Sequence, residues 1–362
     1  AAVAGLDADL RVAIETAIER VRAVSVNSLS RPSVTNFEPG AKVTQRYVAV
    51  ESVGLYVPGG RAVYPSSVVM NVVPAQVAGV ERLVIATPGQ KAFAGRPHPT
   101  VLATAGLLGV SNILVAGGAA AIASFAFGLK QIDFEPVDLV TGPGNIFVAA
   151  AKRLVRGRVG IDSEAGTTEI LILADESANA NFVANDLISQ AEHDESAASV
   201  LVTDSEQLIK DVQAELQQLV TQTHHSERVQ KALSGQQSAL VLVDDVEAAI
   251  DFANGYAAEH LELMTNQNQN VLGKIVHAGA VFVGDYSPVS LGDYMAGSNH
   301  VLPTGGSARF NAGLSVATFL RPQQVIEYSR SALQAIAGQI DTFAKAEGLP
   351  AHGDAVTARF SS

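Results

Sequence analysis

The chain has 362 residues, 48% of them hydrophobic, which predicts two α/β lobes of ordinary size and excludes a disordered chain. A formal net charge of −12, without any cluster of Lys or Arg, argues against nucleic acid or an anionic membrane as a partner and favours a small molecule. The chain has no cysteine, so any metal must be held by nitrogen and oxygen atoms, and the cytoplasm is the expected compartment.

Short β-rich runs recur along the chain, with helical segments between many of them. Their apolar residues are consecutive rather than alternating, which is typical of parallel strands covered on both faces. The predicted class is α/β, doubly wound, and the uneven spacing leaves a regular eightfold barrel as an alternative only. The runs are RLVIATP (82–88), NILVAGG (112–118), VDLVTGPG (137–144), EILILAD (169–175), SVLVTDS (199–205), ALVLVDD (239–245) and AVFVGDY (280–286).

An uncharged stretch from 101 to 129 is long enough to raise the possibility of a membrane helix. Gly106, Gly109 and the pair Gly117 and Gly118 divide it into helix, strand, turn and helix, which is the pattern of a buried α/β unit. We therefore predict no membrane segment. No secretory signal is expected either, because charged residues interrupt the first segment of the chain.

Three glycine-rich turns follow or accompany predicted strands, at 56–60, 115–121 and 141–147. In the last of these, TGPGNIF, a strand leads into Gly142 and Gly144, and Asn145 is placed to cap a helix that begins near Ile146. Such a turn presents backbone N–H groups to a phosphate. The third glycine of the usual dinucleotide motif is missing, and tight turns need glycine without any ligand, so both interpretations stay open.

Polar residues interrupt the apolar face of a predicted helix in LISQAEHDE (187–195). Gln190 and His193 are three residues apart, so on one helical face they can converge on one point. A single histidine at a helix end is more often a surface residue, so partners are needed. Other titratable residues in apolar or glycine-rich surroundings are candidates: Glu259 and His260, Asp293 and His300, Glu347 and His352.

The adjacent pair Glu259 and His260 suggests proton transfer. On a helix the two side chains would point about 100° apart and reach different atoms of one substrate. An adjacent carboxyl and imidazole suit two separate proton transfers. In the alternative interpretation, Glu259 lies on a solvated face and His260 packs among apolar neighbours.

Together these motifs resemble one family, histidinol dehydrogenase, and look most similar to its actinobacterial members. The resemblance covers essentially the whole chain, and it rests on the strings GLYVPGG, TGPGNIFVAAAKR, DLISQAEHDE, AAEHLE, SLGDYMAGSNHVLPT and LPAHGDAV. It implies two Rossmann-like lobes with a C-terminal arm, in a homodimer. The implied first lobe is discontinuous, 1–55 and 170–313; the second, 56–169, binds NAD; and the arm, 314–362, contributes to the partner's active site.

The resemblance also implies a zinc- and NAD-dependent oxidation of L-histidinol through the aldehyde to L-histidine, the last step of histidine biosynthesis. His260 would accept the hydroxyl proton, and Glu259 would activate a water at the aldehyde stage. Tyr56 and Asn145 would contact NAD. One Zn²⁺ per subunit would be bound by Gln190, His193, Asp293 and His352. The substrate would contact Thr168, Gln190, His193, His260, Asp293, His300, Glu347 and His352.

The chain departs from the family pattern in three places. Ala120 replaces a glutamine that usually contacts the cofactor, so one NAD contact is expected to be missing. Thr167 replaces a proline, although the following Thr168 keeps its hydroxyl. The chain also begins inside the family pattern, so an N-terminal segment is expected to be absent.

Two other functions remain possible on the sequence alone. A paralogue on the same scaffold would oxidise a different polar alcohol. A catalytically silent binding or assembly protein would explain Ala120 as a sign of decay. The presence of Glu259, His260 and every expected zinc ligand argues against the silent protein.

Overall fold

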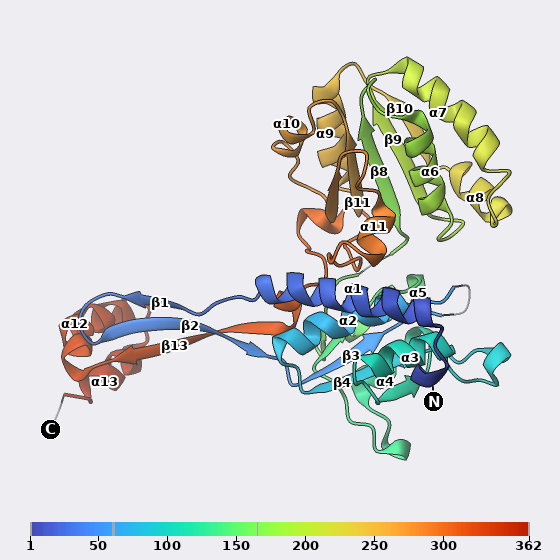
Figure 1. The fold of residues 1–362 in the computed structure, drawn as a ribbon. Helices are drawn as coiled ribbons and strands as arrows, with labels where there is room; N and C mark the ends of the chain where they lie inside the picture. Colours follow the sequence, from blue (N-terminus) through green and yellow to red (C-terminus); the bar gives the residue numbers. More distant parts are fainter. Residues whose placement is uncertain (1, 60–61, 165, 361–362) are drawn as a thin grey trace. The chain divides into compact units, whose positions relative to one another are not determined.

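The computed structural model describes residues 2–59, 62–164 and 166–360, which form two compact units (Figure 1). Unit 1 comprises Ala1–Leu29 and Val50–Phe319, and unit 2 comprises Ser30–Ala49 and Leu320–Ser362. Unit 1 contains two sheets of five strands each, and every strand pair in them is parallel. The prediction of two doubly wound α/β lobes is confirmed.

One lobe is built on the sheet β5-β4-β3-β6-β7 and is called the first lobe from here on, although most of it lies in 56–169, the expected second lobe. Because the strand order reverses between β3 and β6, a crevice is expected at the carboxyl ends of these two strands. The strands are β3 (Ser52–Tyr56), β4 (Arg82–Thr87), β5 (Ile113–Val115), β6 (Leu139–Thr141) and β7 (Gly160–Ile161). The helices are α1 (Ala8–Asn27), α2 (Pro65–Ala78), α3 (Pro99–Leu107), α4 (Gly118–Phe127) and α5 (Ile146–Val155).

The second lobe repeats this strand order in the sheet β10-β9-β8-β11-β12. The consecutive apolar runs become buried strands, as in β8 and β9, where Leu171 and Leu201 are inaccessible to solvent. The strands are β8 (Glu169–Ala174), β9 (Ala198–Thr203), β10 (Ala239–Leu242), β11 (His260–Met264) and β12 (Ala280–Val283). The helices are α6 (Ala180–Ala191), α7 (Glu206–Leu219), α8 (Ser226–Leu233), α9 (Val246–Tyr256), α10 (Asn268–Leu272) and α11 (Val289–Tyr294).

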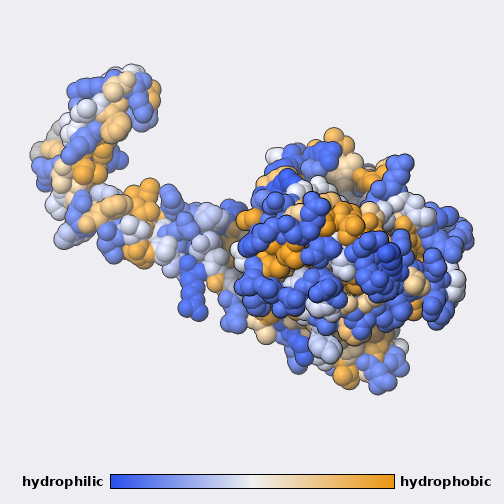
Figure 2. Space-filling model, turned by 90° about the horizontal axis from the view of Figure 1, so that it is seen from above, coloured by the Kyte–Doolittle hydropathy of each residue, from blue (hydrophilic) through white to orange (hydrophobic). Residues whose placement is uncertain are grey.

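The uncharged stretch from 101 to 129 forms the end of α3, then β5, then α4, as predicted. Within the described residues, no helix has both the length and the apolar character needed to cross a membrane. On the face shown in Figure 2, hydrophilic residues cover most of unit 1, and hydrophobic residues form smaller areas between them.

The contacts divide unit 1 differently from the expected boundaries. Helix α1 was expected in the 170–313 lobe, but Ile14 and Val21 belong to the same buried cluster as Val68 of α2 in the other lobe. These α1 residues lie on one helical face, which must be covered by apolar neighbours. Val301 and Leu314 join the same cluster, so the chain returns to this lobe after α11.

Unit 2 contains an antiparallel sheet of order β1-β2-β13 and two helices that pack on each other. It includes residues 30–49, which were expected in the same lobe as 170–313, and it begins again at Leu320 rather than at 314. Strand β2 pairs with β13 along its whole length, which explains why both segments belong to one unit. The elements are β1 (Ser33–Asn36), β2 (Ala41–Ala49), β13 (Leu320–Tyr328), α12 (Arg330–Ala346) and α13 (Pro350–Thr357).

Candidate active site

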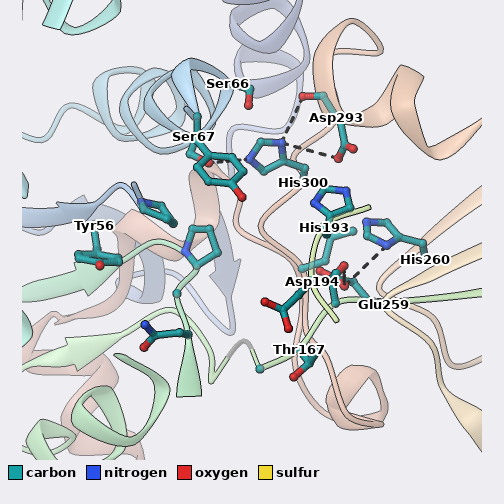
Figure 3. A pocket seen from close by; sticks show the side chains of 18 of the residues that line it. Tyr56, Ser66, Ser67, Thr167, His193, Asp194, Glu259, His260, Asp293 and His300 are labelled. Carbon is teal, nitrogen blue, oxygen red and sulfur yellow. Dashed lines mark hydrogen bonds and ion pairs between the residues drawn. The ribbon is translucent and has the colours of Figure 1, made fainter. Parts of the chain in front are cut away.

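A cavity of about 570 Å³ lies in unit 1 and is lined by residues of both lobes (Figure 3). This volume is within the usual range for small-molecule sites. The first lobe contributes the carboxyl ends of its strands, with Tyr56 at the end of β3. The second lobe contributes the amino ends, because Thr168 precedes β8 and Glu259 precedes β11. The cavity therefore lies at the expected crevice of the first sheet but not of the second.

The glycine-rich turn after β6 borders the cavity through Pro143, Gly144 and Asn145. The Asn145 side chain caps α5 by accepting hydrogen bonds from the N–H groups of Phe147 and Val148, at 3.1 and 3.2 Å. The prediction of a helix starting at Ile146 is confirmed. The turn presents the N-terminus of an α-helix to the cavity, which favours a negatively charged ligand.

Glycine at position 142 is a requirement of the fold itself. Its φ is +110°, and a Cβ there would lie 2.1 Å from the carbonyl oxygen of Tyr56. The Tyr56 hydroxyl in turn accepts a hydrogen bond from the Gly118 N–H at the start of α4, 3.0 Å away. Ala120 follows on the first turn of α4, where it is exposed and is not among the residues that line the cavity.

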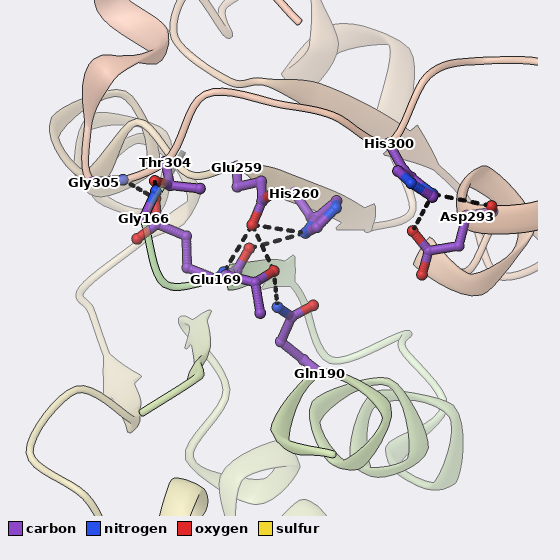
Figure 4. Close-up of polar contacts among 10 residues, drawn as sticks. Gly166, Glu169, Gln190, Glu259, His260, Asp293, His300, Thr304 and Gly305 are labelled. Atoms are coloured by element: carbon purple, nitrogen blue, oxygen red, sulfur yellow. Dashed lines mark hydrogen bonds and ion pairs between the residues drawn. The ribbon is translucent and has the colours of Figure 1, made fainter. Parts of the chain in front are cut away.

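Glu259 lies just before β11, so the expected helical arrangement of Glu259 and His260 is wrong. Helix α9 ends at Tyr256, because Ala257 adopts a left-handed conformation with φ of 55°. The Glu259 carboxylate accepts hydrogen bonds from the Thr168 hydroxyl at 2.6 Å and from the Glu169 N–H at 3.0 Å (Figure 4). Burial nevertheless raises the pKa of Glu259 to about 8.

His260 begins β11 and lines the same cavity. Its Nδ1 lies 3.1 Å from the Glu169 carbonyl oxygen. Since a carbonyl can only accept, Nδ1 carries the hydrogen and Nε2 retains a lone pair. Burial lowers the pKa of His260 below its ordinary value. A neutral imidazole with one free basic nitrogen therefore stands beside the buried Glu259 carboxyl.

Gln190 is in the last turn of α6, whereas His193 follows the helix end. The expectation that the two residues share one helical face is therefore wrong. The Gln190 amide donates to the Thr168 hydroxyl at 2.6 Å (Figure 4). Its Oε1 is buried and accepts no hydrogen bond from the described residues. His193 lines the cavity, and burial lowers its pKa, which keeps the imidazole neutral.

Asp293 and His300 also line the cavity, as expected for neighbouring site residues. His300 Nδ1 lies 3.2 Å from the backbone carbonyl oxygen of Asp293, to which it donates. The other ring nitrogen, Nε2, lies 3.2 Å from the hydroxyl of Ser67 in the first turns of α2. Burial lowers the pKa of His300.

The sequence did not point to Ser67, although it lines the cavity and links α2 to His300. Its signal is weak, since a serine after Pro65 in the first turn of a helix is common for reasons of capping alone. Other lining residues missed from the sequence include Tyr64, Thr167, Asp194 and Tyr294.

The residues expected to hold the metal are divided between the units. Gln190, His193 and Asp293 belong to unit 1, while His352 lies in α13 of unit 2 and is exposed. Glu347, at the end of α12, is likewise an exposed residue of unit 2. Over 2–59, 62–164 and 166–360, no three His, Cys, Asp or Glu residues are grouped so that they could hold a metal ion.

The donor types in unit 1 nevertheless fit a zinc ion. The Gln190 Oε1 atom is a buried oxygen without a hydrogen-bond donor, and the His193 imidazole is neutral. Nitrogen and oxygen ligands of this kind suit zinc in a protein without cysteine.

Comparison of the sequence with a family model and with curated proteins gives histidinol dehydrogenase. The family model for histidinol dehydrogenase matches residues 1–360. The chain is 59% identical to the histidinol dehydrogenase of Leifsonia xyli over 99% of this chain and 83% of the relative. It is also 59% identical to that of Mycolicibacterium smegmatis, over 99% of this chain and 81% of the relative. The crystal structure of histidinol dehydrogenase from Elizabethkingia anophelis superposes with a TM-score of 0.94 at 36% identity, covering 99% and 82% of the two chains.

Proposed function

Since the chain belongs to the histidinol dehydrogenase family, which catalyses the last step of histidine biosynthesis, we propose that the cavity of unit 1 carries out both oxidations of L-histidinol. The observation that supports this most directly is the pairing of Glu259 and His260 in one cavity. One group is a neutral imidazole and the other is a carboxyl with a raised pKa, so each can serve a different proton transfer.

In the first oxidation, His260 acts as the base. Its Nδ1 hydrogen is donated to the Glu169 carbonyl, so Nε2 accepts the proton of the substrate hydroxyl. The C–H bond of the alcohol carbon breaks at the same stage, and its electron pair leaves as hydride, for which bound NAD would be the acceptor. The product is the aldehyde, and His260 is left protonated.

In the second oxidation, Glu259 acts on a water molecule. The water oxygen bonds to the aldehyde carbon while its proton passes to the carboxylate, giving the anion of the hydrate. The hydrate anion then loses hydride, for which a second NAD would be the acceptor, and the resulting carboxylic acid releases its proton to solvent to give the carboxylate of L-histidine. A pKa of about 8 places Glu259 close to neutral pH, where a general base is most effective.

We propose that Gln190, His193 and Asp293, with His352 as the fourth ligand, bind a zinc ion, which supplies an electrophilic site for substrate nitrogens when bound. The Gln190 amide group donates to Thr168, and the Thr168 hydroxyl donates to Glu259. Gln190 and the catalytic carboxyl are thus connected by one chain of hydrogen bonds. Thr168 and His300 complete the contacts to the substrate in unit 1.

The cofactor half of the proposal uses the first lobe. NAD supplies the hydride acceptor, and its phosphates would be received at the turn before α5, where Asn145 caps the helix. Tyr56 lines the same side of the cavity. With Ala120 in place of glutamine, the chain has one side-chain contact fewer for this cofactor.

We further propose a homodimer in which Glu347 and His352 of unit 2 contribute to the site of a second copy. The division of the candidate ligands between the two compact units supports this arrangement, because His352 does not belong to the unit that contains the cavity. The reaction is proposed to take place in the cytoplasm, which accords with a chain free of cysteine.

A comparison of two substrates tests the function. NADH formation is followed with L-histidinol and with L-leucinol, an amino alcohol without an imidazole ring, in protein treated with chelator and then resupplied with zinc. We expect rapid oxidation of L-histidinol only, lost on chelation and restored by zinc. Faster oxidation of L-leucinol would favour a paralogue, and absence of NADH with either alcohol would favour a silent binding protein. Full activity in protein shown by elemental analysis to be metal-free would refute the zinc site.

A further inference from the structure

A buried ion pair holds the backbone of Gly142 from both sides. The Lys152 ammonium group donates to the Gly142 carbonyl oxygen at 3.1 Å. The Asp162 carboxylate accepts from the Gly142 N–H at 2.8 Å and also pairs with Lys152. The two side chains are 1% and 3% exposed. The backbone N–H and the carbonyl of Gly142 are therefore both bound by the ion pair of Lys152 and Asp162. No step of the proposed reaction uses this ion pair.

The pair joins three parts of the first lobe. Lys152 is in the last turn of α5, the helix that begins at the glycine-rich turn. Asp162 directly follows β7, the edge strand that runs parallel to β6. Gly142 directly follows β6. The turn is thus fixed at its first residue, immediately before Pro143, Gly144 and Asn145 enter the cavity wall.

Stability alone gives little reason for such a pair. Removing two charges from water is costly, and apolar residues of similar volume often replace a buried ion pair without loss of stability. The charges also matter locally, because an unpaired Asp162 carboxylate beside the turn would repel the phosphates of a dinucleotide. With Lys152 present the pair has no net charge, and the N-terminus of α5 stays favourable for an anion.

We propose that Lys152 and Asp162 are positioning residues for the cofactor: by binding Gly142 at its N–H and its carbonyl, they hold the turn from 142 to 145 in the form that receives the phosphates of NAD. This inference rests on the proposed function, because it assigns the turn to NAD. It predicts a defect confined to cofactor binding, since the pair contacts none of the residues proposed to hold L-histidinol.

The test compares three variants of the zinc-loaded protein. Lys152→Met removes the donor to Gly142 and leaves Asp162 unpaired. Lys152→Met/Asp162→Asn removes both charges but keeps an acceptor for the Gly142 N–H. Arg153→Met is the matched control, because Arg153 is the next residue of α5 and its ion pair with Glu164 is on the surface. For each variant, NAD affinity is measured by calorimetry and thermal stability is measured by thermal unfolding. The KM for L-histidinol is measured from steady-state rates at saturating NAD.

We expect the dissociation constant for NAD to rise about tenfold or more in both Lys152 variants, as for the loss of one well-formed hydrogen bond to a constrained turn. The KM for L-histidinol and the turnover at saturating NAD should change little. The double variant should be more stable than Lys152→Met, because no buried charge is left alone. The control should match the wild type in all three measurements.

Recovery of NAD affinity together with stability in the double variant would show that the pair serves folding only. A parallel loss of affinity for L-histidinol would lead to the same conclusion. If the wild type itself fails to bind NAD or to oxidise L-histidinol, the proposed function fails. If the wild type does both and the Lys152 variants keep its NAD affinity, only the present inference fails.

Discussion

At the scale of single residues, burial acts in opposite directions on the two neighbours Glu259 and His260. It raises the pKa of the carboxyl to about 8 and lowers the pKa of the imidazole, because each charged form loses solvation. The hydrogen bonds from Thr168 and from the Glu169 N–H oppose this effect on Glu259 without overcoming it. The site thereby holds two proton acceptors that can work at different stages.

This division of roles predicts different defects in the two half-reactions. Glu259→Gln should keep most of the oxidation of L-histidinol to the aldehyde and lose oxidation of the aldehyde about 100-fold or more, because only that stage needs an activated water. His260→Asn should impair both. Rates with supplied alcohol and supplied aldehyde are measured separately for each variant, and an equal loss in both half-reactions for Glu259→Gln would contradict the assignment.

At the scale of elements, most strands of the two parallel sheets were predictable, whereas strand β11 and the end of α9 before it were not. Runs such as EILILAD and SVLVTDS became strands because uninterrupted apolar residues suit a sheet covered on both faces. The strand at 260–264 was missed, because Glu259 and Glu262 interrupt its apolar run. The left-handed Ala257, which separates it from α9, has no local sequence signal.

The candidate site was predictable in its residue types but not in its local geometry. Gln190, His193, Asp293 and His300 could be identified through family motifs, and three of them line the cavity. The hydrogen bond from Gln190 to Thr168 joins residues 22 positions apart, and such a contact depends on the packing of α6 against β8. The spacing of apolar residues within one segment cannot predict this hydrogen bond between two segments.

Two neighbouring carboxyls, the half-buried Asp186 of α6 and the buried Glu262 of β11, connect these elements to α11. Burial raises the pKa of Asp186 to about 6, and burial together with the Asp186 charge raises the pKa of Glu262 well above its ordinary value. Glu262 also accepts a hydrogen bond from the N–H of Val289, the first residue of α11, at 2.9 Å. The helix that contains Asp293 is therefore attached to β11 through this pair.

The pair predicts a pH-dependent stability. Both folded pKa values lie above the unfolded ones, so its favourable contribution is complete below about pH 4 and is lost as the pH rises through about 6. Asp186→Asn cannot ionise and can still donate to Glu262. Its free energy of unfolding relative to wild type should increase by roughly 2 kcal/mol between pH 5 and pH 8. Urea denaturation at pH 5 and pH 8 measures the free energy of unfolding of both proteins. If the difference between variant and wild type is the same at both pH values, Asp186 does not have a raised pKa in the folded protein.

At the scale of the whole molecule, the division into two units separates Glu347 and His352 from the unit that contains the cavity. The sequence could not give the extent of unit 2, because β2 and β13 pair across more than 270 residues of chain. Local patterns do not show such pairing, and the expected boundary at 314 was placed from the family resemblance alone.

The proposed shared site predicts complementation between two inactive chains. His352→Ala and Glu259→Gln homodimers should each be inactive in the complete reaction, yet a mixed dimer has one site with both defects and one with neither. Random exchange of equal amounts makes about half of the dimers mixed, so about a quarter of wild-type activity should return. No recovery after demonstrated subunit exchange would show that each site is formed within one chain.

The yield of NADH per L-histidinol tests the central claim most directly, because the account assigns two oxidations to one cavity. Zinc-loaded protein is given limiting L-histidinol and excess NAD, and NADH absorbance is followed to completion while the products are separated. The account predicts about two NADH per L-histidinol, with L-histidine as the product and no free aldehyde in solution, as expected when the intermediate stays bound. A yield of one NADH, or accumulation of the aldehyde, would contradict it.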